Sequence, residues 1–393
     1  MNKSIRMVLA GGFAWAGAFS ALAANFYWNP SVTDGNWGDA SSWCTDAAGT
    51  TAATSVPGAS DVAYFSGDSL GSTPITVRLT DPRSVSSLQL SGGGLNLTFK
   101  GTATNNVLNC RYNATTFACT DSTLVFDTVG LVRGNTLTLG GSGTTVSVVG
   151  SDLNNAGGEL RIPAGCVFSV SGGSTVTASS LAFTEPVTVA GGSVLQLSGA
   201  ASLVGKALTF SGGSKGVFKG DLSMTGGACL TLDASQVLVL GNVILGSQDG
   251  GDRLVFSGKN PVFRCTGTSF RGHNYKTHTD NTYIDFIVPE GGFAAAPLQC
   301  DTTNPFLKGT NAAYPVYFNV LASSPALSNP NNDTCPLVSA PAGMVKDSVR
   351  LDHETNAVDL DKFILAEDTT SLSVWKSVLS YHLELSVNNP AAG

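Results

Sequence analysis

The sequence predicts an all-β chain that folds as a parallel β-helix, a solenoid of short strands wound into stacked coils. Gly accounts for 46 of the 393 residues and only 12% are charged, which suits short strands joined by tight corners, because Gly accepts positive φ. Short alternating strands separated by Gly-Gly or Gly-Ser corners recur along the chain. Hairpin signals of the Asn-Gly and Asp-Gly type are almost absent. An antiparallel β-sandwich, which also uses short strands, is the alternative.

Residues 1–23 have the features of a signal peptide. Lys3 and Arg6 precede an apolar stretch over 7–19, and Ala21-Leu22-Ala23 offers small residues at the cleavage positions. We expect the mature chain to begin near Ala24 and to be secreted or held at the cell surface. No other stretch approaches the roughly 20 apolar residues of a membrane helix, so no transmembrane span is expected after cleavage. An uncleaved anchor is the alternative.

Residues 24–84 are expected to form an N-terminal capping module rich in Trp. Trp28, Trp37 and Trp43 fall within sixteen residues. Their flat rings suit stacking against sugars, which makes the three residues candidates for glycan binding. They equally suit the closing of an open end of a stacked core, a task that every solenoid must solve, and capping is the favoured interpretation.

The opening of the chain also carries a family resemblance. Its W-x8-W-x5-W spacing, with D-G-x-W and then P-G-A-x-D-x-A-x-F, resembles the start of bacterial secreted and surface proteins with autotransporter-associated β-strand repeats. The Gly-Gly phrases between 85 and 245 look like those repeats, and VPEGGFAAAPL from Val288 is similar to a late segment of such proteins. The resemblance implies a right-handed parallel β-helix, in the manner of a passenger domain, and a location outside the cell.

Residues 85–263 are expected to be the β-helix repeats, about seven or eight coils at roughly 20 to 25 residues each. The clearest copies begin at Leu137, Leu160, Val187, Leu208 and Leu222, which are 23, 27, 21 and 14 residues apart. Alternation within each strand predicts a buried set. The residues predicted to point inward are Leu137, Leu139, Val187, Val189, Leu195, Leu197, Leu208, Phe210, Leu230 and Leu232.

Residues 264–393 are expected to form a closing region of loops and strands, with strands over 358–365 and 372–387. The segment 270–285 gathers acids, bases and aromatics. Tyr275 and Tyr283 are candidates for glycan binding there. Arg271, Lys276 and Asp280 suit a polysaccharide lyase, which needs a cation to neutralise a uronate and a base at the α-carbon. Arg264 and Asp252 are possible neighbours one coil away. The alternative is a solvated loop without chemistry.

Metal and cofactor chemistry have little support in the sequence. No C-x-x-C pair or His-Cys cluster is present, so no zinc site is expected. Ca²⁺ is conceivable at the turn that holds Asp249 and Asp252, although two acids are few ligands. Net charge is −7, which argues against a nucleic-acid partner. The eight Cys suit disulfides in an exported chain, with Cys110–Cys119 and Cys300–Cys335 as possible pairs, or buried thiols.

The function that this pattern favours is that of an exported structural or adhesin-like surface protein without a catalytic site. Its expected partners are glycans or cell-surface components. The alternative is a carbohydrate-active β-helix protein, either a polysaccharide lyase or a glycan binder. The repeats themselves contain nine charged residues and no His, Tyr or Trp between 137 and 245, so any such site is expected near the two ends of the chain.

Overall fold

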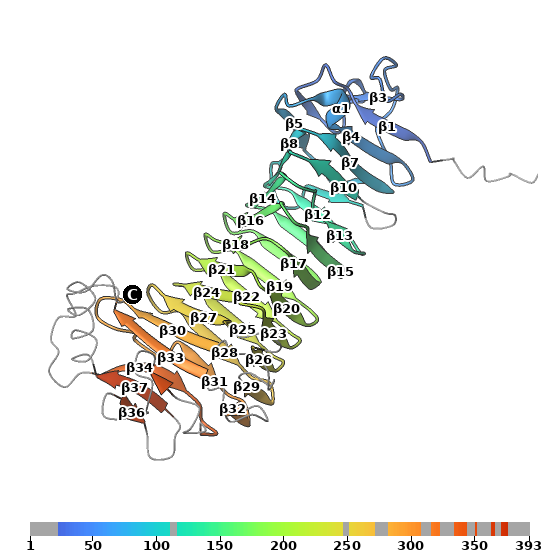
Figure 1. Cartoon of the computed structure of the whole chain (residues 1–393). Helices are drawn as coiled ribbons and strands as arrows, with labels where there is room; N and C mark the ends of the chain where they lie inside the picture. The colour runs from blue at the N-terminus through green and yellow to red at the C-terminus, as the bar shows by residue number, and fades with distance from the viewer. Residues whose placement is uncertain are drawn as a thin grey trace, which may run out of the picture.

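The chain winds into a parallel β-helix of about nine turns. The computed structural model describes residues 23–110, 116–246, 251–271, 282–307, 316–322, 334–343, 350–351, 363–365 and 371–375. Seen from the side, the strands stack like the rungs of a ladder from the N-terminal to the C-terminal end (Figure 1). The predicted signal peptide lies almost entirely outside the described residues.

Three faces make up each coil. The first face is a 13-stranded sheet in which each strand pairs with its equivalent in the next coil. In order, its strands are β2 (Asp34–Asn36), β5 (Ile75–Leu79), β8 (Asn96–Gly101), β11 (Thr123–Asp127), β14 (Thr145–Val149), β16 (Val167–Ser171), β18 (Val187–Val189), β21 (Ala207–Ser211), β24 (Cys229–Asp233), β27 (Arg253–Ser257), β30 (Thr282–Val288), β33 (Val316–Ala322) and β35 (Arg350–Leu351).

The second face is a 14-stranded sheet that follows the first face in each coil. Its strands are β6 (Arg83–Ser84), β9 (Val107–Asn109), β12 (Gly130–Val132), β13 (Leu137–Thr138), β15 (Asp152–Ile162), β17 (Thr175–Phe183), β19 (Val194–Leu197), β22 (Lys215–Phe218), β25 (Gln236–Val239), β28 (Val262–Cys265), β31 (Leu298–Cys300), β34 (Thr334–Ser339), β37 (Ser371–Trp375) and β36 (Phe363–Leu365).

The third face consists of two five-stranded sheets. The N-terminal one holds β1 (Asn25–Trp28), β3 (Trp43–Cys44), β4 (Val62–Ser66), β7 (Ser87–Gly93) and β10 (Thr116–Thr120), and the C-terminal one holds β20 (Ala201–Val204), β23 (Leu222–Thr225), β26 (Val243–Leu245), β29 (Ser269–Arg271) and β32 (Asn304–Leu307). Between them β13 pairs with the end of β15, which pairs with the end of β17. Two short helical turns, η1 (Ala40–Ser42) and α1 (Gly67–Leu70), complete the described elements.

The predicted parallel β-helix is confirmed, because strand pairing along the stack is parallel. Antiparallel pairs occur only at its two ends among the described residues, where β1 meets β3 and where β37 meets β34 and β36. The sandwich alternative is therefore excluded. Parallel pairing also extends beyond the expected repeat span of 85–263, from β1·β4 to β33·β35. β36 lies within the strand expected over 358–365 and β37 covers the start of the strand expected over 372–387. The rest of the two ranges, 358–362 and 376–387, lies outside the described residues.

Apolar residues in equivalent positions stack from coil to coil along the interior. On the first face one such column, with its members in register, contains Val146, Phe168, Val187, Leu208, Leu230 and Leu254. Successive members are 19 to 24 residues apart. The sequence copies are spaced less evenly because Leu222 begins a strand of the third face, whereas Leu208 begins one of the first. All ten residues predicted to point inward are buried.

Candidate functional site

The three Trp residues proposed for sugar stacking are buried at the N-terminal end of the core. Trp28 is 1% exposed, and Trp37 and Trp43 are fully covered. Antiparallel pairing of β1 with β3 places Trp28 opposite Trp43, with ring centroids 5.2 Å apart, and Trp37 lies 4.8 Å from Trp43. No ring presents a face to a sugar in this arrangement. The structure supports capping for these residues.

Two of the three indole N–H groups in this aromatic cluster have backbone partners. Trp28 Nε1 donates to the carbonyl of Val32 at 2.8 Å, and Trp43 Nε1 donates to the carbonyl of Trp37 at 3.0 Å. The rings continue into the solenoid core through Phe65, which stacks on Trp28 at 5.5 Å. The indole N–H of Trp37 is buried without a hydrogen-bond partner. Because aromatic pairs contribute beyond their buried area, this cluster closes the end of the stack chiefly through apolar contacts.

A pair of partly exposed aromatic rings lies on the outside of the same module. Tyr27 and Tyr64 stack with centroids 4.8 Å apart and an interplanar angle of 16°, and both are half-buried. They are register partners in β1 and β4, and Gln89 follows in β7. Sequence reasoning missed this pair because it weighed only the Trp residues. Alternation was the available signal, since Phe26 and Trp28 flank Tyr27 and both are buried.

A second polar and aromatic group lies toward the C-terminal end, on the outside of the first face. Arg253 Nη1 forms an ion pair with Asp285 Oδ2 at 2.9 Å, and its guanidinium lies 4.7 Å from the centroid of the Tyr283 ring. Asp285 is buried, whereas Arg253 is exposed. The three residues meet because Arg253 in β27 is the register partner of Tyr283 in β30. Sequence reasoning selected Tyr283 but missed Arg253, which lies one coil earlier.

Of the three residues selected for lyase chemistry, the structure describes only Arg271. Tyr275, Lys276 and Asp280 lie outside the described residues. Arg271 ends β29 on the third face, and its side chain is half-buried. Tyr283, by contrast, belongs to the first face.

The two expected neighbours of this group are placed elsewhere. Arg264 lies on the second face and pairs with Asp301, with Nε to Oδ2 at 2.6 Å. Asp252 is fully buried, and its Oδ1 accepts a hydrogen bond from the Ala228 N–H at 2.8 Å. The Asp252 carboxylate therefore serves a backbone donor inside the coil, and the Arg264 guanidinium is engaged by Asp301.

The Ca²⁺ hypothesis rested on the same turn. Asp249 lies outside the described residues, and Asp252 points inward as described above. In the part of the chain that the structure describes, no group of three or more His, Cys, Asp or Glu side chains is arranged to hold a metal ion.

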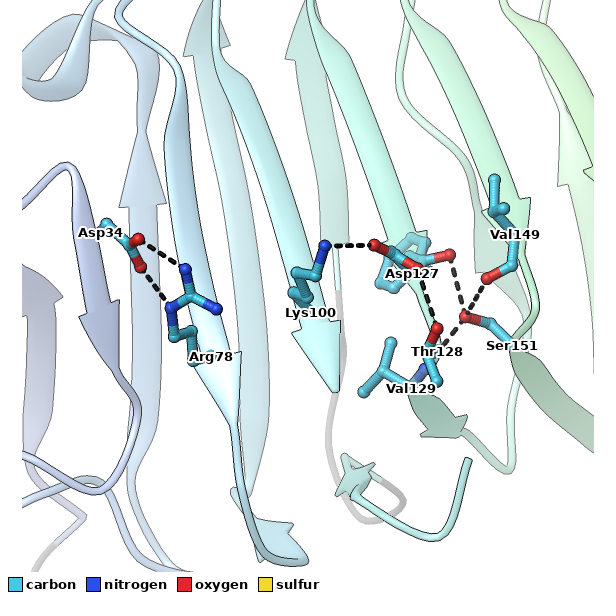
Figure 2. A network of polar contacts seen from close by, with 9 residues as sticks. Asp34, Arg78, Lys100, Asp127, Thr128, Val129, Val149 and Ser151 are labelled. Carbon is cyan, nitrogen blue, oxygen red and sulfur yellow. Dashed lines mark hydrogen bonds and ion pairs between the residues drawn. The ribbon is translucent and has the colours of Figure 1, made fainter. Parts of the chain in front are cut away.

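Ion pairs between neighbouring coils lie near the N-terminal end of the first face (Figure 2). Arg78 donates two hydrogen bonds to the carboxylate of Asp34, both at 2.6 Å, and Lys100 lies 3.1 Å from Asp127. The hydrogen bond from Arg78 is the main cause that lowers the pKa of Asp34 below its usual value. All four side chains are partly exposed, so these ion pairs add little to the free energy of unfolding. Their main effect is to place opposite charges side by side on neighbouring strands.

All eight Cys are free thiols, and seven are buried. The possible disulfides Cys110–Cys119 and Cys300–Cys335 are not formed. Cys300 is instead the register partner of Cys265 in the previous coil. Burial raises the pKa of the Cys265 thiol to about 11 and that of the Cys300 thiol well above its usual value. These thiols are protonated at neutral pH and act as small core residues.

The outside of the first face carries a continuous column of small side chains. Each member is the register partner of the next, through nine neighbouring strands from β5 to β27. The column consists of Thr76, Thr98, Val125, Ser147, Ser169, Thr188, Thr209, Thr231 and Val255. We refer to these nine residues as the hydroxyl column.

Comparison with known proteins identified no similar protein. No protein-family model matches the chain, and the searches of curated proteins and of solved structures gave no match. Among the described residues, no helix has the length and apolar character needed to cross a membrane.

Proposed function

We propose that the chain is an exported, elongated surface protein whose β-helix has a structural or adhesin-like role. The observation that carries the proposal is the uninterrupted parallel stack with its outer hydroxyl column. In the repeats, the polar residues lie at the corners and on a flat outer face. Chemically diverse side chains are concentrated toward the two ends. Such a molecule presents surface over a long distance, which suits adhesion or the building of an extracellular layer.

Export and the likeness to proteins with autotransporter-associated repeats belong to this proposal. The test is expression of the full chain and of a variant lacking residues 2–23 in a Gram-negative host, followed by fractionation and N-terminal sequencing. We expect the full chain to yield a product that begins at Ala24 in the medium or at the protease-accessible surface. The shortened variant should remain in the cytoplasm. An uncleaved full chain found only inside the cell would overturn the proposal.

Glycan binding is the second candidate, and two observations favour it. Tyr27 and Tyr64 offer a partly exposed stacked pair of rings, and Arg253 with Tyr283 and Asp285 combines a ring with a charge pair. Flat rings next to hydrogen-bonding groups are typical of sugar sites. A glycan array with the mature chain tests this. Tyr64→Ala or Tyr283→Ala should weaken binding, whereas Thr177→Ala, on the outside of the second face, should leave it unchanged.

Polysaccharide cleavage is a further carbohydrate-directed function that we propose to test. Incubation with pectins, alginates and other acidic glycans would reveal a lyase by the ultraviolet absorbance of its unsaturated product. Lys276→Ala and Arg271→Ala should then abolish the activity if those residues act as base and as uronate partner. Binding of the glycan without turnover would favour the adhesin-like role instead.

A further inference from the structure

Two buried cysteines lie directly opposite each other in neighbouring coils near the C-terminal end of the stack (Figure 1). Cys265 ends β28 and Cys300 ends β31, and the two are register partners in a parallel pair. Both are fully covered, so alternation along the strands turns both sulfur atoms into the core on the same side of the sheet. In the part of the chain that the structure describes, no other two Cys are register partners.

Hydrogen bonds hold the two strands together on both sides of this pair. The Phe263 N–H donates to the Pro297 carbonyl at 2.7 Å. The Asp301 N–H donates to the Cys265 carbonyl at 2.9 Å, and the Asp301 carboxylate accepts from Arg264 on the outer surface. Neighbouring strands of a sheet lie about 4.8 Å apart, which is within the range of about 4.4–6.8 Å between the Cα atoms of a disulfide. The backbone therefore already stands at a distance that a disulfide can bridge.

We propose that Cys265 and Cys300 are joined by a disulfide in the exported chain. The structure shows the reduced state, in which the Cys265 thiol donates to the Gly241 carbonyl of the preceding coil, with 3.6 Å between sulfur and oxygen. Rotation about the Cα–Cβ bond turns this sulfur toward Cys300 instead. Cys300 thus has a partner one coil earlier, and not Cys335, which the sequence suggested.

The oxidant is a disulfide compound of an oxidising compartment, either a thiol–disulfide oxidoreductase or oxidised glutathione. The thiolate of one cysteine attacks a sulfur of that compound and releases the first reduced thiol. The thiolate of the other cysteine then attacks the mixed disulfide, which forms the bond within the chain and releases the second reduced thiol. Two electrons and two protons pass from the cysteines to the oxidant. Because both thiols are buried once the chain is folded, this exchange takes place before the coil closes over them.

The coil that this bond closes is longer than those in the middle of the stack. Register partners on the second face are 21 residues apart from Phe218 to Val239 and 26 apart from Val239 to Cys265. From Cys265 to Cys300 the separation is 35 residues. A longer coil loses more conformational entropy when its ends are fixed, so a cross-link between its ends stabilises it more. The disulfide would therefore hold the longest of these three coils in the stack.

This inference rests on the proposed export, and a count of thiols tests it. The exported chain is unfolded in guanidinium chloride without reductant, and its reactive thiols are counted. We expect six of the eight Cys to react, against all eight in the variant that lacks residues 2–23 and stays in the reducing cytoplasm. Mass spectrometry of the unreduced digest should show Cys265 joined to Cys300. Eight reactive thiols in the exported chain, or a linkage between other cysteines, overturns the inference.

Single variants of the exported chain check the pairing. Cys265→Ser and Cys300→Ser should each leave seven reactive thiols, because the substitution frees the partner. Cys229→Ser, the control at a partly exposed Cys outside the pair, should leave five. The same count in all three variants overturns the pairing. The linkage found in the unaltered chain is a separate measurement that does not depend on the folding of any variant.

A refolding experiment separates this inference from the export proposal. The cytoplasmic variant is refolded in a mixture of reduced and oxidised glutathione, which supplies the oxidant without export. We expect the Cys265–Cys300 bond to form there as well, and its reduction with dithiothreitol to increase hydrogen exchange in β30 and β31 more than in β16 and β21. A refolded product without this bond overturns the inference even if the chain is exported. A product that contains it supports the inference even if the chain is not exported.

Discussion

At the scale of single residues, the many glycines serve two different purposes. Gly213 has φ of +80° at a corner, with nothing within 4 Å of where a Cβ would stand. Gly241 belongs to a stack of Gly199, Gly220, Gly241 and Gly267 at the corner between the second and third faces. A Cβ on Gly241 would lie 2.4 Å from the Gly220 carbonyl carbon. Gly213 is needed because the backbone there has a positive φ, and Gly241 is needed because neighbouring coils approach too closely for a Cβ.

These two purposes predict unequal costs for the same substitution. Gly213→Ala should lower the free energy of unfolding by about 1–2 kcal/mol, the cost of a left-handed conformation for a residue with a Cβ. Gly241→Ala should cost more, at or above the roughly 1–3 kcal/mol typical of overpacking, because backbone atoms cannot move aside. Chemical denaturation of both variants measures the difference. Equal losses would contradict the distinction.

The thiols allow a further prediction at this scale. Burial raises the pKa of Cys166 and of Cys265 to about 11, so in the folded protein both stay protonated until the pH approaches that value. A thiol-specific reagent at pH 8 should label the native protein slowly, with Cys229 first, since it is the only Cys that is partly exposed. In denaturant without reductant all eight thiols of the protein made in the cytoplasm should react. Fewer than eight would reveal disulfides.

At the scale of elements, a ladder of buried Ser hydroxyls joins consecutive coils at the corner between the first and second faces. The N–H of Ser174 donates to Ser193 Oγ at 3.1 Å, that of Ser193 to Ser214 Oγ at 3.2 Å, and that of Ser214 to Ser235 Oγ at 3.1 Å. Each corner thereby satisfies a buried donor of the coil before it. The ladder aligns the corners that start the strands of the second face.

Removal of one rung should be costly. Ser214→Ala removes the Oγ that accepts from the Ser193 N–H at 3.2 Å and donates to the Ser211 carbonyl at 2.7 Å, in a fully buried position. The Ser193 N–H keeps the Ala190 carbonyl at 3.3 Å, so we expect a loss of about 1 kcal/mol, the net value of a hydrogen bond. Ser211→Ala, three residues earlier on the outer surface, should stay within about 0.5 kcal/mol of the unaltered protein. Thermal unfolding of the two variants compares them. A loss no larger than that of Ser211→Ala would show that the Ala190 carbonyl alone satisfies the Ser193 N–H.

At the scale of the whole molecule, stability depends on contacts between neighbouring coils and on what closes the ends. A solenoid exposes apolar surface wherever the stack stops. The aromatic cluster around Trp43 covers the N-terminal end, and the antiparallel pairs of β37 with β34 and β36 stand at the other end. The coil that contains β4 and β5 is therefore held from one side by β7 and β8 and from the other by β1, β2 and the aromatic rings.

This arrangement predicts that damage to the cap stays local. Trp43→Ala should cost about 3–5 kcal/mol as a large core truncation, and hydrogen exchange should increase in β1, β4 and β5. Strands from β16 to β24 should keep their protection, because each coil depends mainly on its neighbours. Exchange that increases equally in all coils would show that the solenoid unfolds as a single unit.

Part of the site could not be inferred from the sequence. Three Trp in sixteen residues are equally compatible with a cap and with a sugar platform, and only their burial separates the two. Arg253 and Tyr283 are thirty residues apart in sequence, and their contact depends on the length of the intervening coil. The hydroxyl column could not be recognised in the sequence because the spacing between repeats varies. Its members form one row only after the strands are placed in register.

By itself, the sequence favoured a parallel β-helix over an antiparallel sandwich and determined which Leu, Val and Phe side chains face inward, because local alternation and Gly corners act within one coil. Only the tertiary structure decided which residues of different coils meet. Coil lengths vary, so a contact between coils depends on every corner in between. The Trp cap, the Ser ladder, the Arg253 cluster and the hydroxyl column all belong to this second kind.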